Sequence, residues 1–188
     1  MMLPGASALG LVLFISELGL RVGRRSPSAS ARSADRSSLT LLWVTIPLAL
    51  GAGWGLARAL PHWGFHLSIG AHLATVALFA AGLALRWWSI LTLGRFFTVD
   101  VAIHADHQLV TTGPYRIARH PSYTGLVLMF VAIAITYENW GALIVVLVPI
   151  LVALLYRIRV EEEALDAAFG PAYAEYRRTT KALLPGLY

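Results

Sequence analysis

Apolar residues in this chain gather into five long runs, each close to the ~20 residues that a helix needs to cross a bilayer. The third run continues in the same apolar pattern past Arg86 to Leu93. Only Glu138 and Asn139 separate the last two runs, and so short a break requires a tight antiparallel helical hairpin. The pattern therefore predicts an all-α integral membrane protein with five transmembrane helices, at residues 3–20, 39–57, 69–85, 122–137 and 140–156.

Composition agrees with this prediction. Of the 188 residues, 57% are hydrophobic and only 13% are charged, about half the charged share of soluble domains. A soluble globule has no way to bury so much apolar surface. The absence of cysteine from the sequence excludes disulfides, thiolate metal sites and a cysteine nucleophile. We expect a single membrane domain over residues 1–188, with two spans and a loop rich in serine and arginine in residues 1–66 and a catalytic core in residues 67–188.

The distribution of basic residues predicts the orientation. The formal net charge is +5, and 14 of the 15 basic residues are arginine. Most lie in loops on one side of the predicted spans, where membrane orientation explains them better than a nucleic-acid partner. Because cytoplasmic segments carry this excess, we expect the N-terminus outside and the C-terminus in the cytoplasm, with residues 26–38 as a flexible linker. The residues on the cytoplasmic side are Arg21, Arg24, Arg25, Arg32, Arg36, Arg95, Arg116, Arg119, Arg157, Arg159, Arg177, Arg178 and Lys181, against Arg58 on the other.

Candidate chemistry begins in the long segment 94–121, which is too apolar for a disordered loop. Residues 98–101 and 108–111 are suited to pair as short extended segments. Further on, the order His120-Pro121 predicts that the fourth span starts at Pro121, with free backbone N–H groups that attract an anion. The alternative is that Arg119 only anchors the helix at the interface and that His120 only caps it.

A second polar cluster follows the fifth apolar run, with Arg157 four positions before Glu161 and Arg159 four before Glu163. Three consecutive glutamates wrap around much of a helix, so at least one is expected to face inward, while Glu163 is expected to face solvent. Residues 169–171, Phe-Gly-Pro, predict the end of this helix and the start of another. Tyr173, Tyr176 and Arg177 then line one side of a short interfacial helix, where packing at the membrane surface is an alternative role for the tyrosines.

Two motifs carry a family resemblance. The first is Gly113-Pro-Tyr-Arg-x-x-Arg-His-Pro-x-Tyr-x-Gly125, and the second is Arg157-x-x-x-Glu-Glu-x-x-Leu-x-x-x-Phe-Gly-x-x-Tyr-x-x-Tyr176. Together with the tight hairpin they resemble the isoprenylcysteine carboxyl methyltransferase family, integral-membrane enzymes related to the phospholipid N-methyltransferases. The resemblance covers roughly residues 75 to 185. The first two spans and the Ser/Arg-rich loop carry no mark of the family.

The resemblance implies S-adenosylmethionine as cofactor, with S-adenosylhomocysteine as product, and methyl transfer at the cytoplasmic face. The acceptor is expected to be lipophilic, prenylated or another hydrophobic small molecule with a carboxylate, and to enter from the bilayer among the membrane lipids. The cytoplasmic loop and the C-terminal interfacial helices are expected to form the cofactor pocket. The implied catalytic residues are Arg119, Glu162 and Arg157; the implied cofactor-binding residues are Leu109, Val110, Gly113, Tyr115, His120, Pro121, Tyr123, Gly125, Glu161, Tyr173 and Tyr176, and no metal ligand is implied.

The residues themselves agree with this chemistry. A helix N-terminus with His120 suits the carboxylate of the cofactor, and a glutamate suits its ammonium or ribose hydroxyls. Arg119 would orient an acceptor carboxylate. An alternative class is a small membrane transporter or sensor in which Glu17 and Arg86 line a substrate route, because charges inside spans are functional candidates. An amine headgroup or a phenol is also a possible acceptor.

Overall fold

A computed structural model of the protein describes residues 4–23, 33–97 and 108–183. The regular structure in these residues is helical, as predicted, and strand pairing is limited to two isolated bridges. Short 3₁₀ turns lie at Pro61–Trp63, Gly94–Phe96 and Gly113–Arg116. The α-helices are α1 (Ala6–Gly23), α2 (Ser33–Ala59), α3 (Ile69–Leu93), α4 (Pro121–Ile135), α5 (Trp140–Phe169) and α6 (Pro171–Thr179).

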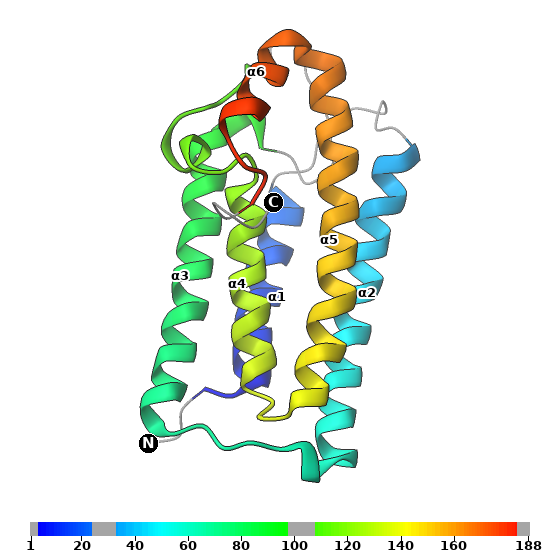
Figure 1. Cartoon of the computed structure of the whole chain (residues 1–188), viewed down its shortest axis with the longest axis vertical. Helices are drawn as coiled ribbons and strands as arrows, with labels where there is room; N and C mark the ends of the chain where they lie inside the picture. The colour runs from blue at the N-terminus through cyan, green and yellow to red at the C-terminus, as the bar shows by residue number, and fades with distance from the viewer. Residues whose placement is uncertain (1–3, 24–32, 98–107, 184–188) are drawn as a thin grey trace.

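The five long helices stand side by side as a bundle (Figure 1). The closest neighbours are α3 with α4 and α2 with α5, and α1 lies behind α4 in this view. The short helix α6 and the turn at Gly113–Arg116 cover one end of the bundle, here called the α6 end. The α4–α5 connection and the segment between α2 and α3 lie at the other end, here called the hairpin end.

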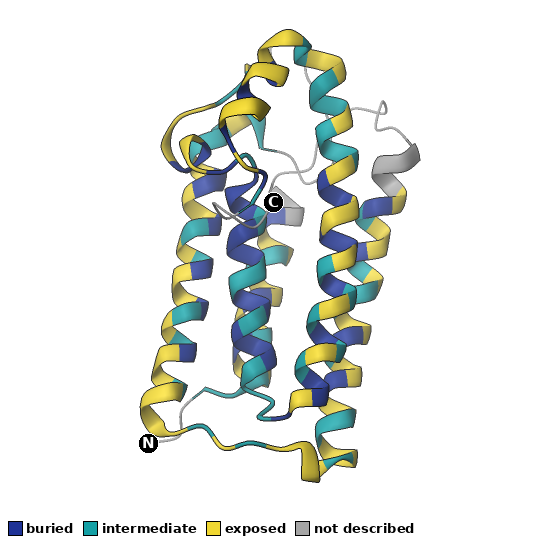
Figure 2. Ribbon diagram, viewed as in Figure 1, coloured by how far each residue is buried: buried dark blue, intermediate teal, exposed yellow. Residues whose placement is uncertain are grey.

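Among the residues that the structure describes, three segments are long and apolar enough to cross a membrane: Ser37–Ala59, Ile69–Phe96 and Trp140–Phe169. Two shorter apolar helices, Ala6–Leu20 and Pro121–Ile135, accompany them. The outer face of α5 is apolar and exposed, with Ile144, Val148 and Val152 at 55%, 54% and 61%. These residues recur every four positions, so they form one stripe that is suited to lipid and not to water. Figure 2 shows the same division into an outward exposed face and an inward buried face.

The predicted hairpin is confirmed. Helix α4 ends at Ile135 and α5 begins at Trp140. Asn139 caps α5, because its side chain accepts a hydrogen bond from the Ala142 N–H at 3.0 Å, and it also donates to the Leu60 carbonyl at 2.8 Å. The preceding residue, Glu138, has a φ of +52°, which turns the chain between the two helices.

The predicted linker at residues 26–38 is wrong in its second part. The serine-rich segment 33–38 is not a linker but the first part of α2. Its Ser38 side chain is fully buried and accepts a hydrogen bond from Arg157. The local composition does not predict this tertiary contact. Residues 24–32 and 98–107 lie outside the described residues, and so does one partner of the predicted extended pair. The other, residues 108–111, is neither helix nor strand.

Two glycines set how closely α3 and α4 approach. A Cβ atom added at Gly125 would lie 2.5 Å from the backbone oxygen of Gly82, and one added at Gly82 would lie 2.7 Å from the Gly125 oxygen. Such contacts between small residues let membrane helices pack backbone to backbone. Gly125 was expected to contact the cofactor; the structure places it against α3.

We predict that Gly125→Ala lowers the free energy of unfolding in detergent, without any cofactor present, by ~1–3 kcal/mol, the usual cost of overpacking a close contact. Gly55→Ala in α2 is the matched control, because a Cβ atom there meets nothing within 4 Å. Thermal unfolding of both variants checks the prediction. Equal stability of the two variants would contradict the close α3–α4 crossing.

Candidate active site

The start of α4 places His120 at the α6 end of the bundle. Pro121 occupies the first helical position, as predicted, and His120 is the N-cap residue, but its side chain makes no capping hydrogen bond. The ring faces α5 instead: Nε2 lies 3.3 Å from Glu162 Oε1, and Nδ1 lies 3.9 Å from Glu161 Oε2. The His120 ring is buried, at 3% exposure, so this orientation is fixed by its surroundings. His120 is therefore at the cap position, as the alternative expected, but its side chain serves the contact with α5 instead of the helix start.

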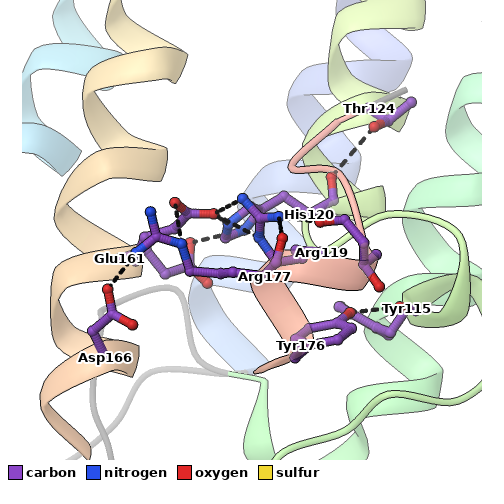
Figure 3. A network of polar contacts seen from close by, with 10 residues as sticks. Tyr115, Arg119, His120, Thr124, Glu161, Asp166, Tyr176 and Arg177 are labelled. Carbon is purple, nitrogen blue, oxygen red and sulfur yellow. Dashed lines mark hydrogen bonds and ion pairs between the residues drawn. The ribbon is translucent and has the colours of Figure 1, made fainter. Parts of the chain in front are cut away.

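Arg119 points into the same cluster (Figure 3). Its Nε and Nη2 lie 2.8 and 2.7 Å from Glu162 Oε1. Its Nη1 donates to the backbone carbonyls of Thr180 and Arg177. Glu162 also forms an ion pair with Arg177, whose Nε lies 4.0 Å from Glu162 Oε2. The Arg119 and Glu162 side chains are only 9% and 13% exposed, and a buried charge of this kind requires such partners.

The segment after α6 closes over this cluster. The backbone N–H groups of Arg119 and His120 donate to the carbonyls of Lys181 and Ala182, both at 2.8 Å. The Tyr176 hydroxyl donates to the Tyr115 carbonyl. Gly170, with a φ of +51°, ends α5 and allows the chain to turn back into α6, as its sequence position predicted. No local signal in the sequence predicts the contacts of Lys181 and Ala182.

Three tyrosines of the cluster stay neutral at ordinary pH. Burial raises the pKa of Tyr176 to about 12 even though the Arg119 charge lowers it. Burial, with Glu161 for Tyr115 and Glu162 for Tyr173, raises the pKa of these two further. The Tyr173 hydroxyl is buried and has no hydrogen-bond partner among the described residues. An unpaired buried hydroxyl is costly, which makes it a natural contact for a polar ligand atom.

A cavity of about 290 Å³ opens beside this cluster and continues between the helices. Its polar wall includes the buried Arg157, which donates to Ser38 Oγ at 2.8 Å and to the Tyr123 hydroxyl at 3.4 Å. The other polar lining residues include Tyr115, Arg119, His120 and Glu161; the apolar lining residues include Leu13, Phe14, Leu42, Trp43, Ile46, Leu50, Leu126 and Phe130.

The cavity brings together six of the residues singled out from the sequence: Tyr115, Arg119, His120, Tyr123, Arg157 and Glu161. Glu162 and Tyr176 join them through direct contacts. Leu109 and Val110 are half-buried in the segment before Gly113, which has a φ of +59°. These three, like Pro121 and Gly125, are not among the residues that line the cavity.

The cavity also reaches a second ion pair that the sequence analysis did not foresee as a pair. Arg86 Nε and Nη2 lie 2.5 and 2.6 Å from the two oxygens of Glu17, and Arg86 Nη1 donates to Ser122 Oγ at 2.7 Å. The pair joins α1 and α3, and Ser122 adds the first turn of α4. Because each charge satisfies the other, the two residues do not form the open charged route that a transporter needs.

The apolar helical bundle, with a polar cluster at one end, places this protein in the class of all-helical membrane proteins. Comparisons with known proteins identify its family. The Isoprenylcysteine carboxyl methyltransferase (ICMT) family model matches residues 75–167. Protein-S-isoprenylcysteine O-methyltransferase A of Arabidopsis thaliana is 31% identical over 139 residues, which cover 63% of this chain and 70% of that protein. Protein-S-isoprenylcysteine O-methyltransferase B of the same plant is 36% identical over 106 residues, 55% of this chain and 54% of that protein. The chain thus belongs to the isoprenylcysteine carboxyl methyltransferase family.

A solved structure supports the fold. The eukaryotic intramembrane Ras methyltransferase ICMT, solved without a monobody, matches with a TM-score of 0.59 and 22% identity, over 97% of this chain and 65% of that one. The present chain spans about half the length of the second plant relative and about two thirds of the solved one. The family motifs run from the turn at Gly113–Arg116 to α6, whereas α1 and α2 precede the matched region.

Proposed function

We propose that this protein transfers a methyl group from S-adenosylmethionine to the carboxylate of a lipophilic acceptor. One observation carries the proposal: a single cavity joins the polar cluster of Arg119, His120 and Glu161 to an apolar wall between the helices. A polar cofactor and an apolar acceptor need such adjoining surfaces, because methyl transfer depends mainly on holding both in line.

The residues of the polar cluster fit the cofactor. The positive end of α4, which begins at Pro121, and the His120 ring suit its carboxylate. The Glu161 carboxylate is suited to the ammonium group or the ribose hydroxyls. The buried Tyr173 hydroxyl lies beside Arg119, outside the residues that line the cavity, and is proposed to offer one more hydrogen bond. Leu109, Val110 and Tyr115 are proposed to cover the adenine, and Tyr123 and Tyr176 to complete the pocket.

S-adenosylmethionine supplies an electrophilic methyl group: an acceptor carboxylate oxygen forms the new C–O bond as the C–S bond breaks, giving a methyl ester and S-adenosylhomocysteine. Arg119 and Arg157 both line the cavity and are proposed to hold the acceptor carboxylate. Glu162 does not line it and contacts Arg119 directly. Glu162 is therefore proposed as a positioning residue, and no longer as a catalytic one, because it acts by fixing the Arg119 guanidinium.

The acceptor is proposed to carry an apolar tail that enters from the bilayer, and a prenylated cysteine is the first candidate. Two relatives are named for isoprenylcysteine, and the wall formed by α1 and α2 is apolar apart from Glu17, which pairs with Arg86. We further propose five transmembrane spans, with the N-terminus outside and the α6 end in the cytoplasm. The basic residues described at the α6 end support this orientation, because cytoplasmic segments carry the excess of arginine and lysine.

The cofactor assignment predicts that His120→Ala and Glu161→Gln each weaken binding of S-adenosylhomocysteine ~10-fold or more, the effect of losing a charge-assisted hydrogen bond. Titration calorimetry on the purified protein measures the affinity. Glu163→Gln is the matched control, because its side chain is 71% exposed and pairs only with Arg159 among the described contacts. Unchanged affinity in both test variants would refute the cofactor site.

The acceptor assignment predicts that Arg119→Lys lowers methyl-transfer turnover ~10²-fold or more while S-adenosylhomocysteine still binds. Lysine offers a point charge where arginine offers a planar pair of donors, although both anchor equally well at an interface. Tritiated methyl transfer to N-acetyl-S-farnesylcysteine measures turnover, with Arg159→Lys as control because Arg159 is 82% exposed. Near-normal turnover in Arg119→Lys would mean that Arg119 is only an anchor.

The orientation predicts which ends of the bundle a membrane-impermeant maleimide reaches in intact cells. Because the sequence has no native cysteine, His62→Cys at the hairpin end should react from outside. Arg116→Cys at the α6 end should react only after permeabilisation. Both side chains are exposed, so access depends on the side of the membrane alone. The reverse pattern would overturn the proposed topology.

A further inference from the structure

The end of the cavity that lies farthest from the α6 end, here called its deep end, can be assigned from the lining residues. Helix α1 runs toward the α6 end, whereas α2 and α4 run away from it (Figure 1). The lining residues farthest from the α6 end are therefore Gly10 on α1, Leu50 on α2 and Phe130 on α4. Phe130 follows His120 by ten positions, so the deep end lies ~15 Å along α4 from the polar cluster.

Packed core closes the cavity beyond this point. Phe130 is 1% exposed, and Ile133, one turn further along α4, is also 1% exposed. Val146 of α5 is fully buried in the same core. A tail whose carboxylate lies at the polar cluster therefore meets close-packed side chains at the level of Phe130, and such a core yields little to an added group.

Gly10 leaves space in the wall at this depth. A Cβ atom added at Gly10 meets nothing within 4 Å, although the residue lines the cavity. Gly10 is half-buried, and Leu13 and Phe14, about one turn away on α1, also line the cavity at 3% and 53% exposure, so Gly10 lies between the buried and the exposed faces of α1. A larger side chain at position 10 would thus extend into the cavity without displacing a neighbour.

Polar contacts along its length hold α1 in place. The Glu17–Arg86 ion pair fixes it near the polar cluster, and Trp87 Nε1 donates to Ser16 Oγ at 3.0 Å beside it. At the other end, His72 Nε2 lies 3.0 Å from the Pro4 carbonyl. Contacts at both ends of α1 make this wall a fixed boundary of the cavity.

We infer that α1 determines the longest apolar tail the protein accepts, with Gly10 beside the end of that tail. The inference rests on the proposed function for its acceptor, and it makes Gly10 a specificity-determining residue outside the region matched by the family. The ~15 Å between the polar cluster and Phe130 limits the length of tail that the cavity can hold. A bulkier residue 10 shortens this distance, and a smaller residue 130 lengthens it.

The test uses Gly10→Ala, Gly10→Leu and Phe130→Ala, with N-acetyl-S-geranyl-, S-farnesyl- and S-geranylgeranylcysteine as acceptors. Gly19→Leu is the matched control: it lies on α1, its Cβ atom also meets nothing within 4 Å, and it does not line the cavity. Alanine and leucine favour helices more than glycine does, so these substitutions preserve α1. Equilibrium binding to the purified protein and methyl transfer are measured for each acceptor.

The expected result is a selective loss that grows with tail length. Gly10→Leu should bind the farnesyl and geranylgeranyl compounds ~10-fold or more weakly, because part of the tail stays unburied, and the geranyl compound nearly normally. Gly10→Ala should lie between, and Phe130→Ala should improve geranylgeranyl binding relative to farnesyl binding. An equal loss for all three tails in Gly10→Leu, or the same selectivity in Gly19→Leu, would overturn the inference.

The two readouts separate this inference from the proposed function. Length-selective binding without methyl transfer would leave the inference standing and refute the proposed reaction on these acceptors. Methyl transfer by all variants without length selectivity would support the reaction and refute the role of Gly10.

Discussion

The α6 end of the bundle depends on the contacts that the largely buried Glu162 carboxylate makes. It meets Arg119 and His120 at the start of α4 and Arg177 at the end of α6, so one group on α5 joins three elements. A buried charge is costly unless it is paired and hydrogen-bonded. The segments that surround Glu162 must therefore come together, and the Arg119 contacts with the backbone after α6 follow from that requirement. The polar wall of the cavity is the outcome.

The charged residues farther inside the bundle are also paired, as buried charges must be. Glu17 and Arg86 satisfy each other, and Ser122 accepts the remaining contact from Arg86. Around them the helices pack through apolar side chains and through the backbone contact of Gly82 with Gly125. The part of the chain that matches the family holds the polar cluster, whereas α1 and α2 build much of the apolar wall.

Local sequence signals were sufficient for the helix boundaries near the site. Proline at position 121, asparagine at 139 and the Gly170-Pro171 pair start and stop helices where the structure has them. Each acts through its own backbone or nearest turn, so its effect is readable without knowing the fold. The serines of residues 33–38 misled the linker prediction, because the burial of Ser38 against Arg157 outweighs their weak local preference.

The sequence by itself determined an all-helical chain of membrane type, a hairpin between α4 and α5, and two polar motifs. Only the tertiary structure decided which glutamate faces Arg119, that the His120 ring turns from the helix start to α5, and that Gly125 packs against α3. It also decided that α1 borders the cavity and that Glu17 neutralises Arg86. These outcomes depend on contacts between residues some 40 to 70 positions apart. Periodicity and capping act over a few residues, so only the packing of complete helices fixes such contacts.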